Sequence, residues 1–278
     1  MNNLHKALAA VTICLVFTIS YRIFLLISAN LSRRKSFVQA TEAGPNAKKD
    51  RLLSQPNQAA EHISGTETRS ERPRPLHLLV VLGSGGHTTE MLRLLSSRCG
   101  LYVDRSDEAP TLVTFVYART DKRTPLWKQR FEEELPRTWK VVGWKAIPRA
   151  REVGQSWATS LFTTAHSLLV AAGLFLGKDG VYPDRRMYTP LPNIVICNGP
   201  GTCIPPCLIA LLVRLWRGMF WTGADRRFPR IIFIETVARV HRLSLTGKIL
   251  YRFADRFLVQ WPELTERHQY AEFYGRLV

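Results

Sequence analysis

The sequence has few acidic residues and few cysteines, and both shortages restrict its function. Only 22 aspartate and glutamate residues accompany 39 lysine and arginine residues, which gives a net charge of +17. This imbalance favours an anionic partner such as a nucleic acid, a membrane surface or a phosphorylated ligand. The five cysteines are an odd number, without a CxxC unit or a nearby histidine cluster. They argue against a disulfide framework or a zinc site, and we expect reduced thiols.

A long hydrophobic run occurs at the amino terminus. Residues 7–29 are long enough to cross a bilayer as a helix, and Arg22 is the one charged residue in the run. Basic residues 33–35 follow it, so the positive-inside rule places residues 1–6 in the lumen and the rest of the chain in the cytoplasm. A cleaved signal peptide is the alternative, but the run exceeds a typical signal core and lacks a small-residue cleavage site.

The next segment, residues 30–75, contains few large apolar residues and reads as a disordered cytosolic tether. From residue 76 to 278, short apolar runs alternate with helical periodicity. This alternation predicts a doubly wound, parallel α/β sheet of the Rossmann type. The expected strands are 76–82, 111–118, 140–147, 193–198, 230–235 and 256–260, and the expected helices are 87–97, 154–176, 203–216 and 247–253.

Other segments of this region have no clear period or an unusual composition. Residues 177–192 and 217–230 are rich in Gly, Pro and Arg, so we interpret them as surface loops. The apolar stretch 160–177 raises the alternative of a second membrane span, but it lies within the alternating pattern and contains His166, so we expect a buried helix that covers the sheet. Residues 205–221 combine leucines with arginines and aromatics, which fits either core packing or a membrane surface.

The sequence GSGGHT directly follows the first expected strand, at the sheet edge where such folds bind ligands. A Walker loop is excluded because no G-K-[ST] follows, and position 88 is Thr where a dinucleotide fingerprint needs Gly. A tight glycine turn before a helix fits a diphosphate. A purely structural turn, capped by a hydroxyl, is the alternative. The candidate diphosphate ligands are Gly83, Ser84, Gly85, Gly86 and Thr88.

His87 is a candidate general base, since a neutral imidazole can accept a hydroxyl proton near neutral pH. Its alternative is a histidine that only orients the loop. Glu235, the second catalytic candidate, closes an apolar strand, where an acid is uncommon, and it either binds a sugar hydroxyl or pairs with Arg239.

Two further segments follow expected strands. After residue 147, two arginines precede a helix start and would suit phosphate oxygens or anionic lipid, although solvated arginines are the ordinary alternative. The sequence NGPGTC, at 198–203, is a second glycine turn. These segments add the candidate binding residues Arg149, Arg151, Gln155, Ser156, Asn198, Gly199, Gly201 and Thr202.

Five separated motifs occur in an order that matches a known family: VVLGSGGHTTEML, REVGQS, NGPGTCIPP, IIFIETVARVHRLSLTGKILY and ADRFLVQWPEL. In this order, behind an amino-terminal anchor, the chain resembles the membrane-anchoring subunit of the dolichol-pathway UDP-N-acetylglucosamine transferase. The resemblance spans residues 76–278 and implies the amino-terminal, acceptor-side half of a split GT-B glycosyltransferase. The tether and the segment 177–192 depart from the family pattern, so we carry no role over to them.

The resemblance implies that a soluble subunit supplies the donor-binding half and that this chain recruits it to the cytosolic face of the endoplasmic reticulum. Together they would add the second N-acetylglucosamine to GlcNAc-diphosphodolichol in an inverting transfer that needs no metal and no cofactor beyond the donor UDP-GlcNAc. The resemblance also allows contact with the preceding GlcNAc-phosphate transferase and a location in the nuclear envelope. The implied partner-docking residues are Tyr270, Phe273, Tyr274, Leu277 and Val278.

Two other functions remain open at this point. The chain could be a membrane scaffold whose glycine turn is only structural. It could also be a basic nucleic-acid-binding module, but a membrane span and the absence of an RNA-binding signature disfavour that class.

Overall fold

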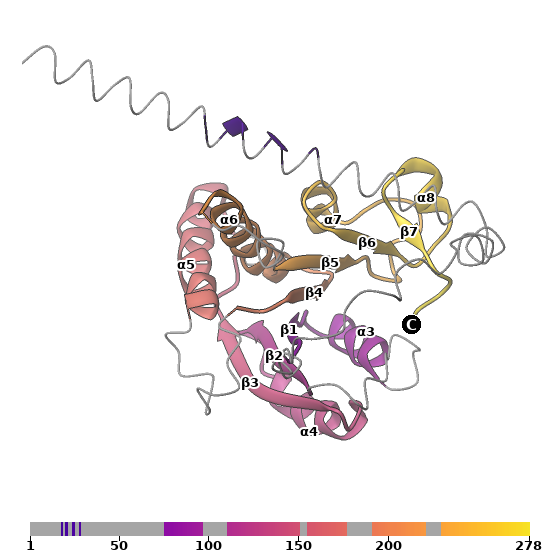
Figure 1. The fold of residues 1–278 in the computed structure, drawn as a ribbon. Helices are drawn as coiled ribbons and strands as arrows, with labels where there is room; N and C mark the ends of the chain where they lie inside the picture. Colours follow the sequence, from indigo (N-terminus) through magenta and orange to yellow (C-terminus); the bar gives the residue numbers. More distant parts are fainter. Residues whose placement is uncertain are drawn as a thin grey trace, which may run out of the picture.

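A parallel β-sheet organises the molecule. The computed structural model describes residues 75–96, 110–150, 155–176, 191–220 and 229–278, together with six single positions between 18 and 28. Within these residues the strands are all parallel and lie in the order β3-β2-β1-β4-β5-β6-β7 (Figure 1). They are β1 (His77–Val81), β2 (Thr111–Ala118), β3 (Trp139–Ile147), β4 (Ile194–Asn198), β5 (Arg230–Ile234), β6 (Arg256–Val259) and β7 (Glu272–Phe273). The predicted doubly wound fold is confirmed.

Helices cover both faces of the sheet. They are α3 (Gly86–Leu95), α4 (Thr124–Glu134), α5 (Trp157–Leu176), α6 (Ile204–Phe220), α7 (Leu245–Leu250) and α8 (Glu263–Arg267), with a 3-10 turn η2 at Gly201–Cys203. The sequence prediction missed α4, α8 and β7. The expected loop at 217–230 was wrong for its first four residues, because α6 continues to Phe220.

Alternate residues of each strand serve two cores. Leu78, Val80 and Leu82 pack with residues of α3 and α4 on one face. Leu79 and Val81 pack on the other face with residues of α5, α6 and α7. This division is expected from the two-residue period of a strand that is buried on both sides.

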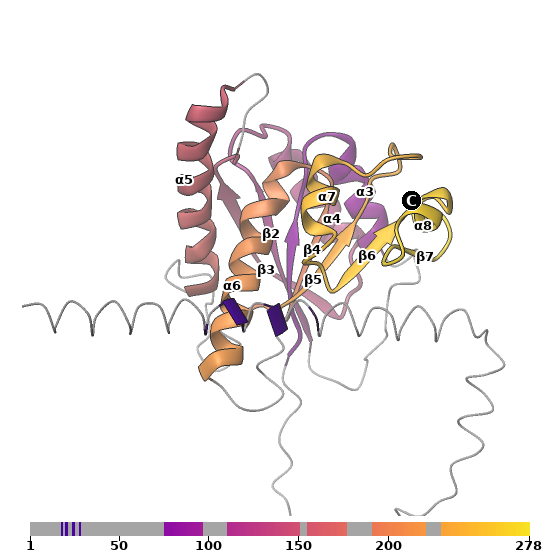
Figure 2. The ribbon, with the colours of Figure 1, turned by 90° about the horizontal axis from the view of Figure 1, so that it is seen from above.

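The helix α5 differs from its prediction. It packs against α6 and contributes Ala171, Leu174 and Phe175 to the core, but it stands at the edge of the domain (Figure 2). Leu161, Phe162 and Leu169 are 73–80% exposed. The expectation of a buried helix was therefore wrong, because one side of this largely apolar helix packs against the domain while the other side is exposed. Among the described residues, Thr159–Leu176 is the one segment long and apolar enough to span a membrane.

Several predictions fall outside the described residues. Most of the amino-terminal span, the tether up to residue 74 and nearly all of the segment 177–192 belong to this group, while the six described positions of the span are helical.

Candidate functional site

The candidate site lies at the switch point of the sheet, between β1 and β4. The chain turns outward in opposite directions from these two adjacent strands, which pair in register from Leu78↔Ile194 to Val81↔Cys197. Ligands of doubly wound sheets bind at this position, beyond the carboxyl ends of the strands. The glycine turns that follow β1 and β4 meet here.

Two glycines make room for His87. A Cβ at Gly83 would lie 2.5 Å from the His87 Cβ and 2.7 Å from Cδ of Pro200. Gly199 has a φ of +87°, and a Cβ on it would overlap the imidazole ring. Both positions therefore require glycine, for close packing and, at Gly199, for backbone conformation as well. The glycines at 83 and 199 are therefore explained by the close packing of His87 and not by a ligand.

Three other glycines of these turns face open space. A Cβ placed on Gly85, Gly86 or Gly201 would have no atom of a more distant residue within 4 Å. Gly85 precedes α3 with a φ of 63°, and no side chain caps the helix. Ser84 beside it is half-buried. The exposed start of α3 therefore retains room for an anionic ligand.

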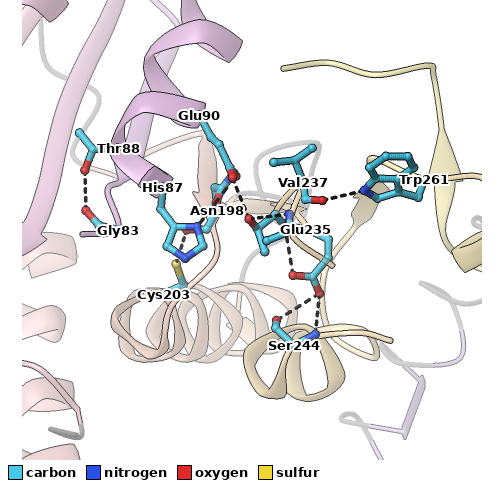
Figure 3. A network of polar contacts seen from close by, with 12 residues as sticks. Gly83, His87, Thr88, Glu90, Asn198, Cys203, Glu235, Val237, Ser244 and Trp261 are labelled. Carbon is cyan, nitrogen blue, oxygen red and sulfur yellow. Dashed lines mark hydrogen bonds and ion pairs between the residues drawn. The ribbon is translucent and has the colours of Figure 1, made fainter. Parts of the chain in front are cut away.

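Thr88 has a structural contact. Its side chain is fully buried, and its hydroxyl donates to the carbonyl of Gly83 at 2.7 Å (Figure 3). This bond closes the turn around the first residues of α3. The Thr88 hydroxyl is thus engaged within the loop, and its backbone N–H donates to the carbonyl of Gly85.

A chain of polar contacts leads away from His87 into the protein (Figure 3). The His87 Nδ1 lies 3.0 Å from Oδ1 of Asn198, and the Asn198 amide donates through Nδ2 to Oε2 of Glu90 at 2.8 Å. The hydroxyl of Thr236 donates to the other carboxylate oxygen of Glu90 at 2.7 Å. These contacts join the ends of β1, β4 and β5. The sequence prediction brought together His87 and Asn198 correctly on one rim.

The network shifts the pKa of both charged groups. The nearby carboxylate of Glu90 raises the pKa of His87 against the opposing effect of burial, with smaller contributions from Asn198 and Glu235. For Glu90, burial favours the neutral form, but the contacts with His87, Asn198 and Thr236 outweigh it and lower the pKa. Glu90 is therefore ionised at neutral pH, and its Oε2 lies 3.9 Å from the His87 Nδ1.

Glu235 has a different environment from the one expected of a substrate-binding acid. It is fully buried and accepts hydrogen bonds from the backbone of Thr236 and from both the backbone and the hydroxyl of Ser244. Ser244 in turn caps α7 through Gly247. Burial raises the pKa of Glu235. The carboxylate anchors both ends of the loop 236–244, which begins beside Glu90.

The residues after β3 lie at the start of α5. Ser156 caps this helix, since its hydroxyl accepts from the backbone of Thr159 at 3.3 Å. Gln155 bonds to Thr163, and Arg149 is half-buried, whereas Arg151 lies outside the described residues. In the second turn, Thr202 is buried in η2 beside the exposed Gly201. The contacts described for Gln155 and Ser156 are with Thr163 and Thr159 of α5.

The carboxyl-terminal residues lie against β6. Glu272 and Phe273 form β7, and Leu277 and Val278 pack against Leu94, Ile234 and Leu258. The backbone of Leu277 donates to the side chain of Gln260 at 3.0 Å. Phe273 and Tyr274 are 38% and 46% exposed, while Tyr270 is half-buried. The tail thus combines an anchored end with an exposed aromatic pair.

The sequence analysis missed Glu90 and Thr236. A signal for Glu90 existed, because residues three apart on a helix share one face and His87 and Glu90 have that spacing. Nothing local indicated Thr236, which reaches the site from a position 146 residues further along the chain.

Comparison with known proteins places this domain in a family. Residues 78–277 match the model of the family "Oligosaccharide biosynthesis protein Alg14 like". The chain is 39% identical over 215 residues to the UDP-N-acetylglucosamine transferase subunit ALG14 of Yarrowia lipolytica, covering 74% of this chain and 84% of the relative. It is 36% identical to the Homo sapiens protein of the same name over 208 residues, covering 73% of this chain and 83% of that one.

Among solved structures, Acinetobacter baumannii MurG aligns with a TM-score of 0.42 and 15% identity, over 73% of this chain and 45% of MurG.

A third relative by sequence is the Schizosaccharomyces pombe UDP-N-acetylglucosamine transferase subunit alg14, which is 35% identical over 210 residues, covering 75% of this chain and 87% of its own length. The family match extends over nearly the whole described domain. The chain therefore belongs to the Alg14 family.

Proposed function

We propose that this protein is the acceptor-side subunit of a UDP-N-acetylglucosamine transferase. Its relatives carry the name of a transferase subunit, and the Rossmann-type domain offers one rim on which an acceptor could lie. In this proposal a soluble partner binds UDP-GlcNAc, and the pair adds the second sugar to GlcNAc-diphosphodolichol. The chain acts as part of a heteromer.

The position of His87 carries the proposal. The ring sits between the two glycine turns at the switch point, and its side chain is 27% exposed while its polar partners are buried. A base in this place can take the proton of the acceptor hydroxyl. As that oxygen forms its bond to C1 of the donor sugar, the bond from C1 to the diphosphate oxygen breaks and UDP leaves with the electron pair.

The exposed turn at the start of α3 suits the acceptor diphosphate. Gly85 and Gly86 leave the backbone uncovered, and the helix has no acidic residue in its first turn. The partial positive charge of a helix amino terminus favours phosphate oxygens. The open backbone at Gly201 borders the same rim from the other turn. Glu235 has no part in this step, because its carboxylate faces its own loop.

The exposed aromatic residues of the tail suit a protein partner. Phe273 ends the outer strand β7 and Tyr274 follows it, shortly before Leu277 and Val278, which pack on the domain itself. Exposed aromatic side chains are enriched in protein interfaces. We assign the docking of the soluble subunit to this edge.

We place the chain in the membrane of the endoplasmic reticulum, with the domain in the cytosol. The apolar run 7–29 and the basic residues after it support this orientation. The exposed apolar residues of α5, together with Leu212 and Trp216 of α6, support a domain that lies against the bilayer.

A reconstituted complex tests the proposal. The full-length chain, co-purified with its soluble partner, is assayed with UDP-GlcNAc and the lipid-linked acceptor. We expect His87→Gln to reduce kcat by roughly 10²–10⁴-fold, the range of general base catalysis, while the partner still co-purifies. An unchanged rate in that complex would leave the chain as a scaffold. Transfer by the chain without its partner would contradict the role of a subunit.

A further inference from the structure

The contacts of His87 define which of its two nitrogens carries the proton. Because the ionised carboxylate of Glu90 can only accept hydrogen bonds, the group that faces its Oε2 must be the NH₂ of Asn198. The amide orientation of Asn198 follows from this contact. Its carbonyl oxygen then faces Nδ1 of His87 at 3.0 Å.

An amide oxygen also only accepts, so the Nδ1 of His87 must be the donor. In the neutral imidazole the proton therefore sits on Nδ1 and the lone pair on Nε2. Among the described residues Nε2 has no hydrogen-bond partner. The geometry leaves this basic nitrogen for a group outside the described residues.

The positions of these residues exclude a direct role in binding for two of them. Asn198 is 0% exposed and Glu90 is 8% exposed, so neither can reach an acceptor on the surface of the site. Thr236, 5% exposed, fixes Glu90 from the opposite side. Asn198, a candidate ligand in the sequence analysis, contacts the histidine instead.

We propose that Asn198 and Glu90 are positioning residues which hold His87 as the Nδ1–H tautomer, with the Nε2 lone pair free for the acceptor hydroxyl. The proposal rests on the proposed function of His87 as base. It extends that function, because it names the groups that determine the direction of proton transfer. The carboxylate acts on the imidazole through the intervening amide rather than by direct hydrogen bonding.

The same arrangement predicts how pH affects the reaction. The acidic groups that act on His87 come from two elements: Glu90 on α3 and Glu235 at the end of β5. Thr236 and Asn198, which also line the network, are neutral. Because the rate depends on unprotonated His87, it should rise with pH through the pKa of this residue. Removing the charge of Glu90 should move this rise to lower pH.

The test uses the full-length chain in complex with its partner, labelled with ¹⁵N in its histidines, and kinetic assays of the same samples. In the wild type, the ¹⁵N shifts of neutral His87 should identify Nδ1 as the protonated nitrogen. Asn198→Ala removes the acceptor, so the population should move to the Nε2–H form and kcat should fall roughly 10²–10⁴-fold, with a smaller change in KM. The matched control Thr236→Val keeps the Asn198 contact and should keep the Nδ1–H form.

Two further variants separate positioning from general loss of structure. Glu90→Gln keeps the shape but gives Asn198 a partner that can also donate, so the Nδ1–H form should be less strongly populated while the acid limb of the rate profile moves to lower pH. Asn198→Asp places two carboxylates together and should lower the rate. Combining it with Glu90→Gln restores every donor and acceptor, and this double variant should recover the Nδ1–H form and more activity than Asn198→Asp alone.

The outcomes distinguish this inference from the function on which it rests. An Nε2–H tautomer in the wild type, or no recovery in the double variant, would overturn the positioning role even if His87 proves essential. Full activity of His87→Gln would instead refute the base, while the ¹⁵N spectra would still report whether Asn198 sets the tautomer.

Discussion

Replacing Gly199 by alanine should displace His87 from its working position. The residue has a φ of +87°, and its added Cβ would occupy the space of the imidazole. The ring cannot retreat easily, because a second close contact at Gly83 holds the other side of the histidine. The hydrogen bond between Nδ1 and Asn198 should therefore break.

Gly275 offers a matched control. Its φ of +86° equals that of Gly199 within a degree, but no atom lies within 4 Å of a built Cβ. Both alanines share a backbone cost of about 1–2 kcal/mol, the penalty of a left-handed conformation. The overlap with His87 adds about 1–3 kcal/mol for Gly199→Ala alone, as in other overpacked sites. The difference between the variants isolates the contact with the histidine.

Thermal unfolding of the two variants, together with the transferase rate of their complexes, measures this difference. Gly199→Ala should unfold several degrees below Gly275→Ala, and its kcat should fall towards that of His87→Gln. Equal unfolding temperatures combined with an undiminished rate for Gly199→Ala would refute the packing described around His87.

Other contacts lead to predictions of the same kind. Glu235→Gln should destabilise the fold by about 1–3 kcal/mol at neutral pH, because one donor of its loop loses an acceptor. Since burial raises the pKa of Glu235 in the folded state, wild-type stability should decrease as pH rises from 4.5, the ordinary glutamate value, through the folded pKa. Urea unfolding across this range should show the decrease in the wild type and a flatter curve in the variant. Arg214→Met removes the 2.5 Å ion-pair partner of the half-buried Asp255 carboxylate, which keeps its bond from the backbone of Ile231, and urea unfolding should show a loss of about 1–3 kcal/mol. Phe273→Ser should weaken co-purification with the soluble subunit without lowering the unfolding temperature. Leu277→Ser should reduce both the co-purification and the unfolding temperature, because Leu277 packs on the core. Equal effects of the two variants would argue against docking at β7.

The sheet could be predicted because its strands are short apolar runs bounded by turn residues. Residues 111–118 form β2 with the predicted bounds. The sequence analysis missed α4 because the glutamates 132–134 interrupt the apolar pattern of Trp127 and Phe131. Its proline near the start was a signal that could have located it. β7 has two residues and no period from which to predict it.

The exposure of α5 could not be derived from its sequence. Its composition predicts a helix that avoids water, but burial depends on which other elements are present to cover it. A sheet face accommodates one stripe, and α6 covers part of the rest. Composition alone does not distinguish a core helix from one that faces a bilayer.

The sequence located the glycine turns correctly, but it did not indicate why each glycine is needed. Gly83 and Gly199 serve the histidine, whereas Gly85 and Gly86 face open space. The two acids also differ from expectation. Glu235 was visible because it ends an apolar strand, yet it holds a loop. Glu90 lies within a helix, where acids are common, and it acts on His87.

The separation of these partners along the chain has a consequence for biogenesis. His87 and Asn198 are 111 residues apart, and Glu90 and Thr236 are 146 apart. Contacts over such distances form late, because closing a long loop costs entropy before the contact repays it. During synthesis, His87 therefore lacks its contact with Asn198, and Glu90 its contact with Thr236, until β4 and β5 have joined the sheet. In the proposed mechanism, proton transfer by His87 thus requires the sheet to be assembled as far as β5.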